Sequence, residues 1–425
     1  MNRTTSMSNA SEAISSDMPS NDAGRWSQHD TQWVLSLFGT AVGAGILFLP
    51  INIGIGGFWP LLIMTVLAFP MTYLAHRGLA RFVLSSKQTD ADFTDVVEEH
   101  FGPGAGRLIS LLYFFSIFPI LLIYGVGLTN TVDSFIVNQL NMGSPPRVVL
   151  SGILVAGMIA IMMGGEKLLM RTFSALVYPL VAVLLFLSLY LIPNWQMPVI
   201  TTPDAASLTQ TLWLSVPIVV FSFSHAAAIS SFANVQRRHY KTRALSKSEN
   251  ILQCTSIMLI VFVLLFVFSC VLSLSPEQMA EAKQANVSVL SYLANVYDNP
   301  YIAMLGPLVA FIAITSSFLG HFLGARESFN GLMNKQTSLE IKLIDKLGVA
   351  MMFVAIWICA VLNPSILDMM GAISGPIIAM ILFIMPTIAV YKVPALQKYK
   401  GKIGTYFVLI VGLLSVSALL FNMFG

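Results

Sequence analysis

Long apolar runs recur along this chain, and short polar segments that carry most of the charged residues separate them. A run of about 20 apolar residues is the length that crosses the hydrocarbon core of a bilayer as a helix. The pattern therefore predicts an all-α integral membrane protein. The eleven predicted spans are residues 33–55, 58–84, 107–138, 147–163, 170–192, 208–235, 251–274, 300–333, 347–362, 366–391 and 403–424.

The polar segments predict a few smaller elements. Residues 92–102 are typical of a short cytoplasmic helix that Asp92 caps and Gly102 ends. Residues 275–295 predict two short external helices, with Pro276 at a favoured first helical position. Residues 1–30 are polar and lack the basic stretch and short apolar core of a signal peptide. We expect them to form a disordered cytoplasmic tail.

Composition and charge support a membrane protein and orient it. The 425 residues are 56% hydrophobic and 10% charged, whereas soluble proteins carry about 25% charged residues. Lys and Arg gather on the cytoplasmic side of membrane proteins. With the N-terminus inside, only Arg147 and Lys283 of the 23 Lys and Arg residues fall outside. The odd number of spans then places the C-terminus outside.

The first apolar segment contains a run of helix-weakening residues. Gly39, Gly43 and Gly45 lie within seven residues, and Pro50 follows. A helix that is interrupted in a bilayer leaves amides and carbonyls that lipid cannot satisfy, so such breaks persist only inside protein or beside a cavity. Freed amides suit a carboxylate, and freed carbonyls suit an ammonium group or a small cation. Close helix packing through small residues is the alternative explanation.

The sixth apolar segment contains a similar interruption. Pro217 is followed by the polar residues Ser222, Ser224 and His225 and then by small residues. Interrupted segments at matching places in two halves indicate a midplane site in an inverted-repeat transporter. The predicted organisation is a first repeat at 31–193, an external loop at 194–207, a second repeat at 208–391 and a final helix at 403–424.

Several long stretches resemble the hydroxy- and aromatic-amino-acid permease family, and its serine and threonine transporters most of all. These stretches are GTAVGAGILFLPINIG, FPMTYLAHRGLARFVLS, DVVEEHFG, FSFSHAAAISSF, VFSCVLSLSP, SFLGHFLGARESFNG and LNPSIL with GPIIAMILF. The resemblance implies a fold like the bacterial leucine transporter, with five-plus-five inverted repeats, discontinuous helices 1 and 6, and an eleventh helix. It also implies import of L-serine across the inner membrane down a cation gradient, with L-threonine as a further substrate and aromatic amino acids as the alternative.

The candidate substrate site uses the backbone of both breaks. We expect amides of the first break to bind the substrate carboxylate, and carbonyls of both breaks to bind its ammonium group. Glycine suits such a site because it lets a ligand approach the backbone closely. The amides are those of Ala44, Gly45 and Ile46, and the carbonyls are those of Phe221 and Ser222 with that of Thr40 or Ala41.

Three side chains near the breaks are candidates for further substrate contacts. A site that bonds a hydroxyl rejects analogues without one, because its own polar groups would be left unpaired. Ser224 and His225 are the candidates for this bond, and a structural hydrogen bond to the broken backbone is the alternative for His225. Tyr124, near the middle of the third span, is a candidate for the carboxylate, with ordinary packing as the alternative. His321 in the eighth span is expected to be structural.

The resemblance also implies a cation site between the first and eighth spans. In the leucine-transporter fold, two carbonyls of the first helix, one carbonyl of the eighth and two hydroxyls of the eighth hold sodium there. The matching residues are Gly39, Val42, Ala313, Ser316 and Ser317, and oxygen is the donor that hard cations prefer. The serine and threonine relatives carry a lysine where this chain has Ser316. This departure leaves Na⁺ and H⁺ both open as the coupling ion.

Other functional classes have less support in the sequence. A channel would show rings of charge or repeated filter loops. An enzyme would show a zinc-binding HExxH pair, a nucleophile elbow or a phosphate loop, and the sequence contains none of these. We therefore expect no enzyme activity, no cofactor beyond the coupling cation, no nucleic acid and no obligatory protein partner apart from the bilayer.

Ionisable residues inside spans are functional candidates by default. Arg326 and Glu327 lie toward the inner end of the eighth span. We expect them to pair with each other or to form an inner gate. Arg77 and Arg81 end the second span, and we expect them to anchor it at the cytoplasmic interface.

Overall fold

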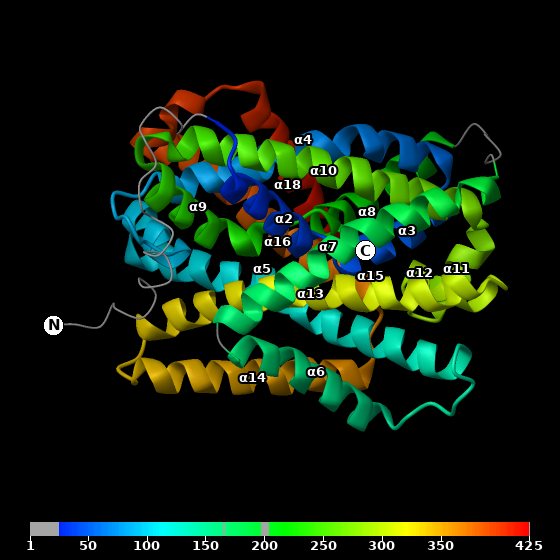
Figure 1. The fold of residues 1–425 in the computed structure, drawn as a ribbon. Coiled ribbons are helices and arrows are strands. Elements are labelled where there is room, and N and C mark those ends of the chain that lie inside the picture. The colour runs from blue at the N-terminus through cyan, green and yellow to red at the C-terminus, as the bar shows by residue number, and fades with distance from the viewer. Residues whose placement is uncertain (1–24, 165, 197–203, 425) are drawn as a thin grey trace.

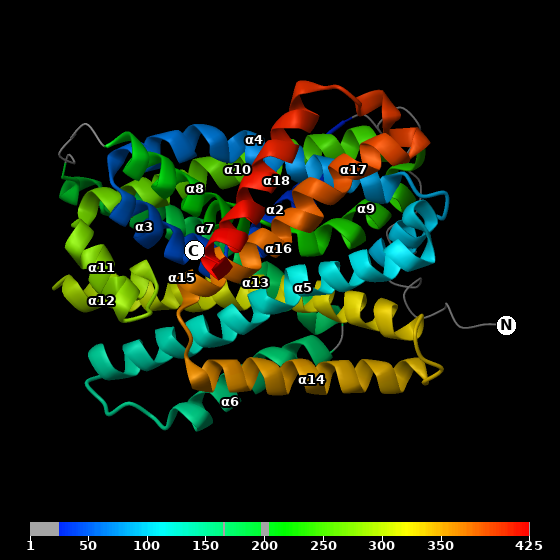
Figure 2. The ribbon, with the colours of Figure 1, turned by 180° about the vertical axis from the view of Figure 1, so that it is seen from behind.

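The computed structural model describes residues 25–164, 166–196 and 204–424, so residues 1–24 of the predicted tail lie outside the described part of the chain. Long helices run between the two ends of an elongated bundle (Figures 1 and 2). The helices are α2 (Gln28–Ala41), α3 (Ala44–Gly56), α4 (Phe58–Leu84), α5 (Phe93–Asn138), α6 (Arg147–Met163), α7 (Glu166–Tyr190), α8 (Ala205–Ser222), α9 (Ala226–Tyr240), α10 (Ala244–Ser273), α11 (Pro276–Gln284), α12 (Val289–Val296), α13 (Pro300–Asn334), α14 (Ile341–Leu362), α15 (Ile366–Asp368), α16 (Gly375–Ala379), α17 (Met385–Lys392) and α18 (Ile403–Phe424).

The helical content confirms an all-α membrane protein. Nine helices of the described chain are long and apolar enough to cross a membrane, and α2 and α3 together form a tenth span that is bent by 55°. The 17-residue α6 is a shorter apolar helix. It lies beside α14 at one edge of the bundle in both views (Figures 1 and 2). Each predicted span overlaps at least one of these helices, and several helices begin before the predicted bounds.

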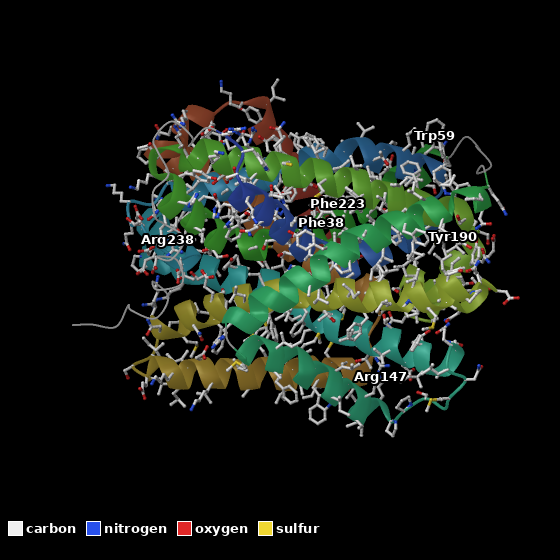
Figure 3. The ribbon with its side chains drawn as sticks, in the orientation of Figure 1. Phe38, Trp59, Arg147, Tyr190, Phe223 and Arg238 are labelled. Atoms are coloured by element: carbon white, nitrogen blue, oxygen red, sulfur yellow. The ribbon has the colours of Figure 1, made fainter. Side chains whose placement is uncertain are left out.

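The two ends of the bundle differ in chemistry. Arg238 lies at one end, and Trp59 and Tyr190 lie at the opposite end (Figure 3). Trp and Tyr are enriched where spans leave the bilayer. We call the end that holds Arg238, Lys335 and the α17–α18 connection the basic end. That this end faces the cytoplasm stays a prediction from the charge distribution of the sequence.

The start of the first span differs from the prediction. The helix begins at Gln28 and not near residue 33, so residues 25–30 do not belong to a disordered tail. The Ser27 side chain accepts a hydrogen bond from the Asp30 amide, and the Asp30 side chain accepts one from the Ser27 amide. This reciprocal pair is a capping box, which satisfies two amides of the first turn.

The predicted connecting helices are confirmed. Asp92 caps the start of α5 with a second capping box, and the chain kinks at Gly102, where φ is +79°. This left-handed conformation favours glycine. On the opposite side, Ser275 caps α11, Pro276 is its first residue, and α12 follows after a short turn.

The tenth span is less regular than the sequence predicts. Its helix contains two wider, π-helical stretches, η3 (Met369–Ser374) and η4 (Met380–Ile384). Each ends shortly before a proline, Pro376 or Pro386. A proline removes one amide donor and its ring clashes with the carbonyl one turn earlier, so the preceding turn widens.

One close approach holds this irregular span against α8. A Cβ atom at Gly375 of α16 would lie 2.2 Å from the carbonyl oxygen of Pro217, a distance that real Cβ atoms do not show. Small residues allow such contacts between membrane helices. The approach fixes α8 just before its end at Ser222.

We expect Gly375→Ala to lower the melting temperature and the folded yield of the purified protein, because its methyl group must displace the α8 backbone. The matched control is Gly157→Ala in α6, where nothing lies within 4 Å of the added Cβ atom. This control should be neutral or should stabilise by up to about 1 kcal/mol through helix propensity. Thermal unfolding in detergent measures both, and equal behaviour of the two variants would contradict the packing argument.

Candidate functional site

The first break lies between α2 and α3. Val42 and Gly43 have extended backbone conformations, and the Leu47 amide donates to the Gly43 carbonyl at 3.3 Å as the first bond of α3. The three preceding amides of Ala44, Gly45 and Ile46 therefore have no acceptor within their own helix. No side chain of the described chain caps this helix start, which is buried. A buried helix start of this kind suits an anion.

The second break lies between α8 and α9, at Phe223, Ser224 and His225. The Phe223 amide donates to the Val219 carbonyl at 3.1 Å, and the Ser224 amide donates to the Phe221 carbonyl at 3.2 Å. The predicted ammonium ligand Phe221 thus already accepts one bond, and a second lone pair of its oxygen remains. Ser224 Oγ accepts from the Ala226 amide at 3.4 Å at the start of α9.

The two breaks are in direct contact. Ser222 Oγ donates to the Gly45 carbonyl at 2.9 Å. A Cβ atom at Gly45 would lie 2.7 Å from Ser222 Cα and 2.9 Å from the Phe221 ring. Only a residue without a side chain permits this approach. The structure therefore brings the predicted carboxylate ligands and the predicted ammonium ligands Phe221 and Ser222 side by side.

Ser317 of α13 joins the end of α2 to α5. Its hydroxyl donates to the Thr40 carbonyl at 2.5 Å, and the Tyr124 hydroxyl lies 2.7 Å from the same oxygen. Because Ser317 has one hydroxyl proton and gives it to Thr40, Tyr124 is the donor of the second bond. A Cβ atom at Gly43 would lie 2.5 Å from Ser317 Cβ and 2.9 Å from the Tyr124 hydroxyl. The glycine at the break therefore makes room for this junction.

The predicted cation ligands are chemically suited to a small hard cation. All five residues are buried and offer neutral oxygen atoms. The Ser316 hydroxyl donates its proton to the Ala313 carbonyl at 3.1 Å, which leaves both of its lone pairs available. Ser317 Oγ accepts from Tyr124, and its second lone pair faces only the longer contact of 3.4 Å with His321 Nδ1 among the described residues. The structure thus ties Ser317 to α2 and Ser316 to Ala313.

His225 is held by a histidine that the sequence analysis missed. The His225 amide donates to His76 Nε2 of α4 at 3.0 Å, and His76 Nδ1 lies 2.7 Å from the Thr72 carbonyl. Since Nε2 must accept, Nδ1 carries the proton and the His76 ring is neutral. The two imidazole rings are stacked, with centroids 3.5 Å apart. His76 lies within a stretch that carries the family resemblance, but nothing local links it to His225.

The side chain of His225 has a structural bond and one unused atom. Its Nδ1 lies 3.2 Å from the Phe223 carbonyl, which is the bond to the broken backbone that we considered as the alternative. Its Nε2 is buried and has no hydrogen-bond partner among the described residues. His321 is held in a similar way, since its Nδ1 lies 2.9 Å from the Ser317 carbonyl.

The comparisons with known proteins agree with this architecture. The sequence profile described as the tryptophan/tyrosine permease family matches residues 32–422. The chain belongs to this family. It is 53% identical over 412 residues to the protein named serine transporter SdaC of Escherichia coli K12, with 94% of this chain and 96% of the relative covered. It is 39% identical over 426 residues to the threonine/serine transporter TdcC of Edwardsiella tarda, with the same coverage.

Solved structures establish the fold of this permease-family chain. The structure of MhsT in complex with L-phenylalanine superposes with a TM-score of 0.62 at 16% identity and covers 92% of this chain and 97% of MhsT. A manganese transporter of Eremococcus coleocola superposes with a TM-score of 0.60 at 14% identity and covers 93% and 87%. These matches confirm the leucine-transporter-like fold.

The predicted pairing of Arg326 with Glu327 is wrong. Arg326 forms a bidentate pair with Asp345 of α14, with both N–O distances at 2.6 Å. Glu327 instead accepts a hydrogen bond from Ser230 of α9 at 3.2 Å. Consecutive helical residues point about 100° apart, so neighbours in sequence reach different helices. Arg81 also has a specific partner, because it forms an ion pair with Glu249 at 2.7 Å.

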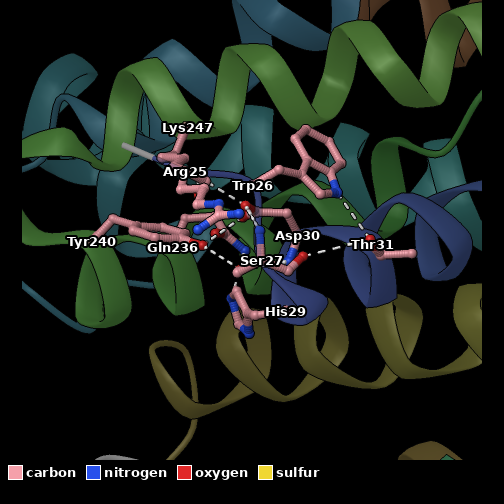
Figure 4. A network of polar contacts seen from close by, with 9 residues as sticks. All are labelled: Arg25, Trp26, Ser27, His29, Asp30, Thr31, Gln236, Tyr240 and Lys247. Carbon is pink, nitrogen blue, oxygen red and sulfur yellow. Dashed lines mark hydrogen bonds and ion pairs between the residues drawn. The ribbon is translucent and has the colours of Figure 1, made fainter. Parts of the chain in front are cut away.

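A buried network fixes the start of α2 at the basic end of this permease (Figure 4). The Asp30 carboxylate, whose side chain is fully buried, lies 2.9 Å from Lys247 Nζ of α10. Tyr240 donates to Asp30 at 2.6 Å, and Lys247 also donates to the Arg25 carbonyl at 2.6 Å. Because α2 leads directly into the first break, this network sets where the break lies relative to α9 and α10.

A second group of ion pairs at the basic end joins α13 to α5. Lys335 Nζ lies 2.7 Å from Asp95 and 3.0 Å from Glu98. Burial lowers the pKa of Lys335, but its hydrogen bonds to the two carboxylates outweigh this effect and hold the pKa above its usual value. The ammonium group therefore stays charged at neutral pH, and the contact between the two helices persists.

We expect His76→Leu to destabilise the protein, because the buried His225 amide loses its acceptor at a cost of about 1–3 kcal/mol. His76→Gln offers a side-chain oxygen as an acceptor and should remain closer to the wild type. Melting temperatures in detergent measure both effects. Equal losses in the two variants would show that ring stacking, and not the accepted bond, holds the residues together.

Breaking the Asp30–Lys247 pair should have a larger effect. Lys247→Met leaves a carboxylate buried without its cation, which costs about 3–5 kcal/mol in comparable buried pairs. The double variant Asp30→Asn with Lys247→Met removes both charges and should recover much of the loss. Thermal unfolding of the two single variants and the double variant gives the coupling. Strictly additive losses would contradict a direct interaction.

Proposed function

We propose that this protein is a secondary active transporter that imports L-serine, with L-threonine as a second substrate, by cation symport. The observation that carries the proposal is the buried contact of the two helix breaks at Gly45 and Ser222. There, unpaired amides of one helix start lie beside the carbonyl end of another helix. The relatives named as serine and threonine/serine transporters support this substrate class.

The chemistry of the breaks suits a zwitterion that also carries a hydroxyl. In the proposal, the amides of Ala44, Gly45 and Ile46 bind the carboxylate. The Ser222 carbonyl and the remaining lone pair of Phe221 bind the ammonium group, together with the carbonyl of Thr40 or Ala41. The unpartnered, buried Nε2 of His225 accepts the substrate hydroxyl, and Ser224 is the other candidate. Tyr124 reaches the carboxylate only when it releases Ser317.

In the proposal, the contacts of Ser317 couple binding of the cation to the geometry of the first break. Ser317 already connects the end of α2 with α5 through Thr40 and Tyr124. A sodium ion held by Gly39, Val42, Ala313, Ser316 and Ser317 would strengthen the contact between α2 and α13 beside the substrate site. A ligand shifts a conformational equilibrium only by its differential affinity for the two states. Sodium would therefore favour the state in which the first break is assembled.

The predicted organisation completes the proposal. Two repeats at residues 31–193 and 208–391 would rock around the breaks in alternating access. In the proposal the predicted connection at 194–207 is external, although its residues 197–203 lie outside the described residues and 205–207 belong to α8, and α18 stands outside the repeats. The protein spans the inner membrane several times, with the N-terminus and the basic end in the cytoplasm and the C-terminus outside.

The family description favours an aromatic amino acid permease as the second candidate. The two candidates differ in the group that the site must accommodate beyond the zwitterion. A serine site needs a hydrogen-bond partner for the hydroxyl, whereas an aromatic site needs apolar space for a ring. Competition of labelled serine uptake by unlabelled threonine and tryptophan distinguishes them.

We expect purified protein in proteoliposomes to accumulate labelled L-serine when a sodium gradient is imposed without a pH gradient. Ser317→Ala removes one oxygen ligand and the link to Thr40, and it should weaken sodium activation about ten- to hundredfold. Ser316→Lys places an ammonium group in the cation site and should abolish the dependence on sodium. The matched control is Ser151→Ala in α6, whose hydroxyl bonds only to its own helix.

Uptake that follows an external acid pulse and ignores sodium would assign the proton as the coupling ion and contradict the sodium site. Uptake of tryptophan without uptake of serine would favour the second candidate. Equilibration without accumulation under either gradient would contradict symport and favour a channel.

A further inference from the structure

A cavity opens at the basic end, away from the helix breaks. Its volume is about 300 Å³, and α4, α17, η5 (Pro394–Tyr399) and α18 with the residues just before it surround it. Its polar lining residues are Arg77, Arg81, Thr387, Tyr399, Lys402 and Thr405. Its apolar lining residues are Leu74, Pro386, Val390, Leu396 and Val408, and Gly78 and Gly404 complete the lining.

The cations of this cavity are unequally neutralised. Arg81 is paired with Glu249 at 2.7 Å and lies over the Tyr399 ring at 3.8 Å. Arg77 has no carboxylate within ion-pair distance in the described chain, and its buried Nε has no hydrogen-bond partner there. Its guanidinium lies 4.7 Å from the centroid of the Tyr73 ring and donates a long hydrogen bond of 3.4 Å to the Tyr73 hydroxyl. Lys402 is exposed and likewise forms no ion pair with a described residue.

The connection beside the cavity adds further unbalanced charge. Residues 392–402 contain four lysines and no Asp or Glu. The ammonium groups of Lys392, Lys398 and Lys400 lie 5.7, 5.1 and 5.4 Å from the centroids of aromatic rings, and no carboxylate of the described chain pairs with them. Cations near aromatic faces keep their charge available to a further anion. This part of the basic end therefore lacks anions of its own.

The apolar lining residues of the cavity indicate what kind of anion fits. Gly404 keeps the space beside Leu74 and Arg77 open, because a Cβ atom there would lie 3.5 Å from Leu74 and 4.0 Å from Arg77 Nη2. A soluble phosphate would leave the partly exposed side chains of Leu74 and Val390 without an apolar partner. A molecule with a charged head and a hydrocarbon tail offers a partner to both kinds of lining residue.

We propose that this cavity binds an anionic glycerophospholipid of the cytoplasmic leaflet. Arg77 and Lys402 hold its phosphodiester, and one acyl chain lies along the partly exposed Leu74 and Val390. Basic pockets between spanning helices on the cytoplasmic side are suited to anionic headgroups, and the planar guanidinium of arginine bonds phosphate through two donors. The lipid would connect α4 with α17 and α18, and this proposal does not depend on the transported substrate.

In the test, phosphatidylglycerol is titrated into the purified full-length protein in detergent. Binding is measured by the change in melting temperature and by native mass spectrometry. Phosphatidylcholine and inorganic phosphate form the two comparison arms. We expect phosphatidylglycerol alone to raise the melting temperature and to remain bound. Lys402→Gln should weaken its apparent affinity about fivefold, as expected for one basic residue, and Arg77→Gln should weaken it further. The matched control is Lys346→Gln on the exposed end of α14.

Each other outcome overturns the proposal. An equal stabilisation by inorganic phosphate would assign a soluble anion, and an equal stabilisation by phosphatidylcholine would remove the role of charge. Unchanged affinity in Lys402→Gln and Arg77→Gln, or an equal loss in Lys346→Gln, would show that lipid binds the basic end without this cavity. If Arg77→Gln does not fold, the affinity of the Lys402→Gln variant alone tests the proposal, because Lys402 is exposed and its substitution should not affect folding.

Discussion

The unpaired peptide groups of two interrupted helices are the constraint on which the centre of this structure depends. Lipid offers them no hydrogen bonds, so other parts of the protein must surround them. Their burial explains why α2, α3, α8 and α9 lie inside the bundle and why the contacts around them are so close. The same groups, held away from water, are what a small charged molecule can use.

Side chains from neighbouring helices hold the two breaks in place. Ser222 reaches across to Gly45, Ser317 of α13 reaches Thr40, and His76 of α4 receives the amide of His225. Each contact joins a broken helix to a different partner. The breaks are therefore fixed at several points, and these contacts leave the amides of Ala44, Gly45 and Ile46 without an acceptor in their own helix.

The sequence predicted what depends on local chemistry. The glycines marked the first break, Asp92 and Gly102 marked the short helix before the third span, and Ser275 with Pro276 marked an external helix. It did not predict partners that lie far apart in the chain. His76 with His225, Asp30 with Lys247 and Arg326 with Asp345 depend on how helices pack, and spacing along one helix carries no information about a facing helix. The π-helical stretches of the tenth span also escaped prediction, although Pro376 and Pro386 were visible.

The neutral ring of His76 has a consequence for acid–base behaviour. It holds the amide of His225 through a lone pair on Nε2. A second proton on the imidazole would occupy that lone pair and would also place a cation against a ring 3.5 Å away. Protonation of His76 and its hydrogen bond to the amide of His225 are therefore mutually exclusive, so the contact between α4 and the second break requires the neutral imidazole.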